Sequence, residues 1–67
     1  MSYSGLTPKQ IVTQSTWCHP DWDVDTHIAY LLHEEGVNLE GVQAPGCKSI
    51  RETINRWKEE ALRTIPR

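Results

Sequence analysis

The strongest pattern of apolar positions lies near the C-terminal end of the chain. Four apolar residues there share one face of an α-helix, at spacings of i, i+4, i+7 and i+11: Ile50, Ile54, Trp57 and Ala61. Ser49, followed three residues later by Glu52, forms a capping box, in which each side chain satisfies a backbone N–H at a helix start. The pattern therefore predicts a helix that begins after Ser49 and that Pro66 ends.

A second helix start lies near the N-terminus. Thr7 is placed to cap it, Pro8 occupies its first position, and Gln10 completes a capping box. Two apolar residues follow, but the residues from Ser15 to Pro20 do not continue the pattern. We therefore expect this helix to be short.

The middle of the chain carries a third helical pattern. Its apolar residues recur at i, i+4, i+7 and i+8: Val24, Ile28, Leu31 and Leu32. The pattern extends to about Glu35, and Gly36 suits the residue that follows a helix end. Residues 17–25 are rich in turn formers and predict a loop, from which Asp23 or Asp25 caps the helix.

Residues 37–42 alternate apolar and polar side chains and fit either a short strand or a single helical turn. We favour a short helix that begins near Asn38, and Ala44-Pro45-Gly46 then breaks the chain. The predicted fold is all-α, a small bundle of three or four short helices in a helix-turn-helix arrangement. Residues 1–67 form one domain, with residues 1–6 expected to be disordered.

The size of the chain limits its core. A chain of 67 residues is near the length at which one core barely offsets chain entropy, so a homodimer would relieve the shortage. No apolar run approaches the ~20 residues that span a membrane, and the first residues do not resemble a signal peptide. We therefore expect a cytoplasmic protein that does not bind membranes.

Two cysteines and three histidines are the candidate metal ligands: Cys18, His19, His27, His33 and Cys47. Structural zinc sites use ligand pairs at short spacing, which this set lacks, so we expect no metal. The simpler interpretation is that both thiols are free and mostly buried, and that His27 and His33 are exposed helix residues. The chain shows no recognisable catalytic constellation either, and we expect neither an enzyme nor a cofactor.

Positive charge is concentrated at one end of the chain. Residues 1–47 carry one base and six acids, a balance of −5, whereas residues 48–67 carry six bases and three acids, a balance of +3. This asymmetry indicates a surface that could bind a polyanion. Ordinary i to i+4 helix pairs, Glu52 with Arg56 and Glu59 with Arg63, would consume part of the excess.

The stretch from Ile28 to Ala61 resembles the amino-terminal DNA-binding helices of plasmid KfrA-type proteins. In that family a helix ending in glycine leads, through a short apolar helix and a turn, into a helix with a Thr-Ile start and a late tryptophan. The matching positions are Gly36, Val42, Gly46, Ser49, Thr53, Ile54 and Trp57. The resemblance covers about half of the chain and implies a helix-turn-helix module that binds double-stranded DNA.

The first turns of the last predicted helix carry the candidate DNA contacts. A recognition helix presents its N-terminal residues to base edges. We expect Lys48, Ser49 and Arg51 to meet phosphates or guanine edges, Asn55 to contact adenine, and Lys58 to reach a phosphate. The protein would act as a small transcription regulator or accessory factor of a plasmid or phage. The competing interpretation is an ordinary solvated helix surface.

A different class of function is also open: an acidic adaptor or inhibitor that binds another protein. Trp17, Trp22 and Tyr30, set among the acids of residues 21–25, could form an aromatic hot spot with a charged rim. In so short a chain, however, tryptophan is more often part of the core. The sequence does not decide between a protein and a nucleic-acid partner.

Overall fold

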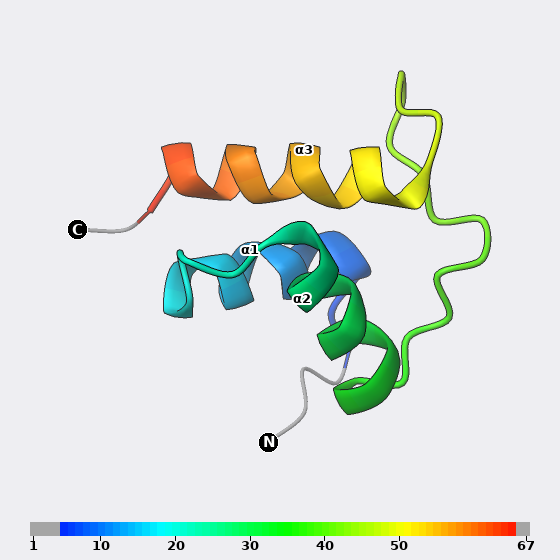
Figure 1. Cartoon of the computed structure of the whole chain (residues 1–67), viewed down its shortest axis with the longest axis horizontal. Helices are drawn as coiled ribbons and strands as arrows, with labels where there is room; N and C mark the ends of the chain where they lie inside the picture. The colour runs from blue at the N-terminus through cyan, green and yellow to red at the C-terminus, as the bar shows by residue number, and fades with distance from the viewer. Residues whose placement is uncertain (1–4, 66–67) are drawn as a thin grey trace.

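The computed structural model describes residues 5–65, which form three α-helices and one short π-helical segment. The elements are α1 (Pro8–Cys18), α2 (Val24–Ala29), η1 (Tyr30–Glu34) and α3 (Ile50–Arg63). Helices α1 and α2 both pack against α3 and lie on the same side of it (Figure 1). The described residues contain no strand, so the predicted all-α fold is confirmed.

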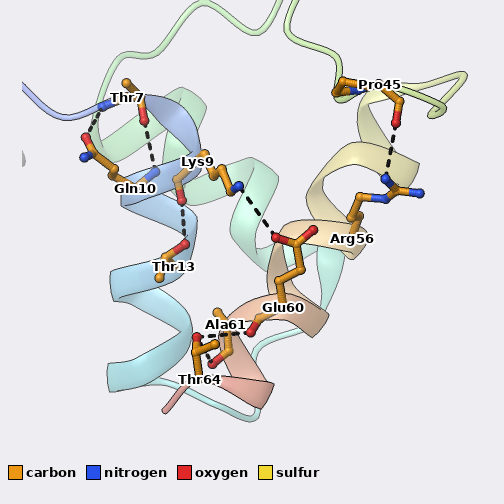
Figure 2. Close-up of polar contacts among 9 residues, drawn as sticks. All are labelled: Thr7, Lys9, Gln10, Thr13, Pro45, Arg56, Glu60, Ala61 and Thr64. Carbon is orange, nitrogen blue, oxygen red and sulfur yellow. Dashed lines mark hydrogen bonds and ion pairs between the residues drawn. The ribbon is translucent and has the colours of Figure 1, made fainter. Parts of the chain in front are cut away.

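Helix α1 begins as predicted. The Thr7 hydroxyl accepts a hydrogen bond from the Gln10 N–H at 3.2 Å, and the Gln10 side chain accepts one from the Thr7 N–H at 2.9 Å (Figure 2). The helix has 11 residues and continues to Cys18, through Ser15 and Thr16, where the apolar pattern does not continue. Ser15 and Thr16 are buried, and their hydroxyl groups take part in hydrogen bonds described below.

Helix α2 continues directly into η1. Asp23 is the cap, and its carboxylate accepts a hydrogen bond from the Thr26 N–H at 2.8 Å. Leu31 is buried, whereas Leu32 is 45% exposed, so the predicted inner position of Leu32 was wrong. His27 occupies the inner face instead, on the other flank of the apolar stripe, which leaves Leu32 facing outward. Gly36 follows η1 with φ of 64°, the left-handed conformation predicted for it.

The connection from residue 35 to residue 49 contains no helix, so the short helix expected from Asn38 was wrong. The Asn38 side chain accepts a hydrogen bond from the Glu40 N–H at 2.9 Å and forms a tight turn rather than a helix cap. Gly41 then has φ of 81°, which a helix does not allow. The predicted helix-turn-helix therefore lacks its middle helix.

Helix α3 matches the predicted boundaries closely. The Ser49 hydroxyl accepts a hydrogen bond from the Glu52 N–H at 3.2 Å. The Glu52 carboxylate accepts its hydrogen bond from the N–H of Lys48, at 2.6 Å, one residue earlier than a standard capping box. The helix ends at Arg63, and Pro66, the predicted stop, lies outside the described residues.

The core is small and is shared by all three helices. Its fully buried apolar cluster consists of Ile11, Val12, Leu31 and Ile54. Leu6 packs against this cluster, although disorder was expected for residues 1–6; residues 1–4 lie outside the described part. Ala61 is buried, and Ile50 and Trp57 are half-buried, so the predicted stripe faces the interior. No helix within residues 5–65 is long and apolar enough to cross a membrane.

Candidate functional site

The five predicted DNA contacts lie in and just before α3. Lys48 and Ser49 precede the helix, Arg51 and Asn55 lie in its first half, and Lys58 lies beyond its midpoint. Lys48, Ser49, Arg51 and Asn55 are exposed, whereas Lys58 is half-buried. Arg51, Asn55 and Lys58 follow each other at i, i+4 and i+7, so these three share one stripe of the helix.

That stripe faces the acidic start of α2. Arg51 forms an ion pair with Asp25, and the Asn55 side chain donates to Glu59 at 3.4 Å. The ammonium group of Lys58 acts on Asp23: after the hydrogen bonds from the Thr26 hydroxyl and N–H, it adds to the lowering of the Asp23 pKa. Much of the positive charge of the stripe is therefore offset within the molecule.

Other basic side chains of the domain also have partners within it. Arg56 donates to the carbonyl oxygen of Pro45 at 3.2 Å, and Lys9 lies 3.6 Å from a carboxylate oxygen of Glu60 (Figure 2). The expected helix pairs, Glu52 with Arg56 and Glu59 with Arg63, are not among the ion pairs of residues 5–65. The outer face of α3 therefore alternates acids and bases rather than presenting a continuous basic surface.

Two of the three residues proposed for protein binding lie together. The Trp22 ring stacks on His19, with centroids 4.2 Å apart and planes 4° apart. Its centroid lies 5.4 Å from that of Tyr30 in a tilted arrangement. Trp17 lies elsewhere, since its indole N–H donates to the Ala61 carbonyl at the end of α3. We call His19, Trp22 and Tyr30 the Trp22 cluster.

The Trp22 cluster is held by short-range contacts and surrounded by acids. His19 ends α1, and the backbone N–H of Trp22 donates to its carbonyl at 3.1 Å. The Tyr30 hydroxyl donates to the Glu35 carboxylate at 2.9 Å. Asp21 and Asp23 are exposed next to the cluster in sequence, and no Lys or Arg occurs from residue 10 to residue 47. The cluster is therefore a partly exposed aromatic surface in an acidic stretch.

His27 is the main feature that the sequence reasoning missed. It was expected to be exposed but is only 1% exposed, and its ring lies between the C-terminal turn of α1 and the Trp22 ring. Nδ1 lies 3.1 Å from the Ser15 hydroxyl, and Nε2 lies 3.2 Å from the Thr16 hydroxyl. The spacing of three residues from Val24 was the one signal of an inner position, but the polar ring suggested the surface.

The hydrogen bonds of Ser15 favour one tautomer of His27. The Ser15 hydroxyl lies 3.1 Å from the Val12 carbonyl and 3.1 Å from Nδ1. When it donates to Val12, it accepts from Nδ1–H, and Nε2 accepts from the Thr16 hydroxyl. Burial, followed by the charge of Lys58, lowers the His27 pKa from its ordinary value. This buried pair of Ser15 and His27 is structural, because no substrate can reach either side chain in this conformation.

The candidate metal ligands do not come together. Cys18 is exposed, although it was expected to be buried, and Cys47 is half-buried; both are free thiols. Both nitrogens of His27 are occupied by hydroxyl groups. Within the described part of the chain, no group of three or more His, Cys, Asp or Glu residues is placed to hold a metal ion.

The chain matches no protein-family model, no curated protein sequence and no solved structure. Function is therefore inferred from the residues and their geometry alone.

Proposed function

We propose that this protein is a small protein-binding module and that the Trp22 cluster contacts a basic segment of its partner. The observation that carries this proposal is the position of Trp22, which is half-exposed and packed between His19 and Tyr30. Rigid aromatic side chains are the usual anchors of protein interfaces, because they bury a large area at a small cost in conformational entropy.

Charge supports a basic partner. The part of the chain that builds the cluster contains no Lys or Arg. Of the three acids at residues 21–25, Asp25 is paired with Arg51, whereas Asp21 and Asp23 are exposed beside the cluster in sequence. Hydrogen bonds from Thr26 lower the Asp23 pKa, so its carboxylate stays ionised near neutral pH. Arginine and lysine side chains are attracted to the faces of Trp and Tyr rings, and neighbouring carboxylates strengthen that attraction. An acidic or uncharged partner would not use this combination.

A titration of isotope-labelled protein with a synthetic Arg-Gly repeat peptide tests the proposal. We expect amide shifts confined to residues 19–35 and a shift of the Trp22 indole signal. The matched control is an Asp-Gly repeat peptide of the same length, which we expect to cause no shifts. The variant Trp22→Ala should lose binding, whereas Trp17→Phe should retain it. Equal shifts with both peptides, or none with either, would contradict the proposal.

Duplex DNA is the second candidate partner, favoured by the exposure of Lys48, Ser49 and Asn55 at the start of α3. In this case the protein is a small DNA-binding regulator, as the resemblance to KfrA-type proteins implies. The ion pair between Arg51 and Asp25 works against this function, because a phosphate must displace a carboxylate. The same titration with duplex DNA at two salt concentrations is the test. DNA binding requires shifts centred on residues 48–58, and a log–log salt slope near −0.9 per neutralised phosphate.

A further inference from the structure

We propose that His27 makes the Trp22 cluster acid-labile, so that mild acid releases a basic partner bound there. This inference rests on the proposed function for its last step, the release. Its first step concerns the free protein alone. In this step α1 moves away from α2 at the hydrogen bonds of His27 with Ser15 and Thr16, a contact that we call the joint between α1 and α2.

A second proton on His27 changes the hydrogen bonds that link α2 to α1. In the neutral ring one nitrogen carries the proton and the other accepts, with the Ser15 hydroxyl 3.1 Å from Nδ1 and the Thr16 hydroxyl 3.2 Å from Nε2. In the protonated ring both nitrogens are donors, so both hydroxyl groups must accept from the ring and donate to other acceptors. Both residues are buried, and a positive charge that is held there by neutral hydroxyl groups is costly. Protonation therefore weakens the contact of His27 with α1.

The charges around His27 leave the protonated ring poorly compensated. Lys58 of α3 and His19 at the end of α1 both disfavour a positive charge on the ring. Asp23 at the start of α2 favours it and offsets part of this effect. Burial of the ring acts in the same direction as the two bases. Opening the joint to water is the remaining way to accommodate the proton.

His27 is coupled to the proposed binding surface through Trp22. The two rings meet edge to face, with centroids 5.4 Å apart and an angle of 68° between their planes. Trp22 also stacks on His19, which directly follows α1. Trp22 directly precedes the cap of α2, whereas His19 follows α1, so a movement of α1 away from α2 separates His19 from Trp22. The cluster then no longer presents one surface.

A histidine NMR titration of the free wild-type protein tests the first step. We expect the His27 ring to be the Nδ1–H tautomer at neutral pH and its pKa to lie below the ordinary value of 6.5. The Trp22 indole signal should shift with the midpoint of His27. If the His27 pKa lies at or above the ordinary value, or if Trp22 does not follow His27, the proposal is overturned.

Binding of the Arg-Gly repeat peptide at about pH 7.5 and about pH 5.5 tests the release, because histidines change charge in this range while aspartates stay ionised. We expect the affinity for the peptide to fall by at most about tenfold for each pH unit, which is the limit when binding is linked to one proton. The variant His27→Gln should lose this pH dependence, whereas His33→Gln should keep it. Acid release that persists in His27→Gln would assign it to His19 and overturn the proposal. If the peptide does not bind at either pH, the proposed function fails, and the titration of the free protein still decides whether His27 opens the joint.

Discussion

The indole N–H of Trp17 donates to the carbonyl oxygen of Ala61 at 3.1 Å and joins the C-terminal ends of α1 and α3. Trp17 is 37% exposed, and a phenylalanine in its place keeps an aromatic ring but has no N–H to donate. We expect Trp17→Phe to lower the free energy of unfolding by about 1 kcal/mol, the usual net value of one hydrogen bond. Urea denaturation followed by circular dichroism measures the change. A Trp17→Phe variant as stable as wild type would mean that the hydrogen bond does not form in solution.

Thr53 attaches the long connection to α3. Its buried hydroxyl donates to the Ser49 carbonyl at 3.0 Å and accepts from the Ala44 N–H at 3.1 Å. Thr53→Val leaves that N–H unsatisfied, so we expect a loss of roughly 1–3 kcal/mol in the free energy of unfolding. Thr13→Val is the matched control, because the half-buried Thr13 hydroxyl donates only to Lys9 within its own helix. The control should change stability by less than about 0.5 kcal/mol.

The stability of the domain should fall in mild acid because of His27. The His27 pKa in the folded state lies below the ordinary value of 6.5. Above this pH both the folded and the unfolded chain carry neutral His27, so His27 adds no pH dependence to the free energy of unfolding. Below it the unfolded chain takes up the proton first, and the free energy of unfolding falls by up to about 1.4 kcal/mol per pH unit. The fall ends at the folded-state pKa.

Urea denaturation at a series of pH values from neutral downward measures this fall. His27→Gln should flatten the curve, although the variant is expected to be less stable at neutral pH. His33→Gln should leave the slope unchanged, since His33 is exposed. A wild-type curve that stays flat below pH 6.5 would be inconsistent with the buried, neutral ring.

The ion pair between Arg51 and Asp25 separates the two candidate partners. Both side chains are largely exposed, so Asp25→Asn should change the free energy of unfolding by no more than about 1 kcal/mol. If α3 binds DNA, the substitution frees Arg51, and affinity for duplex DNA should rise at low salt. Glu40→Gln is the charge-matched control in the connection. Equal effects of the two variants would show that net charge, not Arg51, determines binding.

The helix starts could be predicted because their determinants are local. Thr7 with Gln10, and Ser49 with Glu52, lie three residues apart, and their hydrogen bonds form within one turn of helix. The apolar stripe of α3 could be predicted for a similar reason, since a helical period places its members on one face. These features depend little on the rest of the fold.

The joint at His27 could not be predicted in the same way. Its partners Ser15 and Thr16 lie 12 and 11 residues away in sequence. All three side chains are polar, so each one alone suggests a surface position, and only their mutual hydrogen bonds make burial favourable. The last turns of α1 were not predicted for the same reason, because Ser15 and Thr16 occupy inner positions that the apolar pattern does not mark.

In the candidate site, too, contacts between residues near in sequence could be predicted, whereas contacts between distant residues could not. Trp22 and Tyr30 lie near one another, as their grouping expected, because only Asp23 and the six residues of α2 separate them. Trp17 was grouped with them by proximity in sequence, but its partner is Ala61. The ion pair of Arg51 with Asp25 likewise depends on how α2 packs beside α3, which the charge pattern along the chain does not show.

The position of α3 has a consequence for synthesis. Both α1 and α2 pack on α3, which is the last helix of the described chain to be made (Figure 1). While the ribosome still holds that segment, Ile11, Val12 and Leu31 lack their contact with Ile54. Isolated helices as short as α1 and α2 are only marginally stable in water. We therefore expect the domain to fold in a single cooperative step after α3 has emerged.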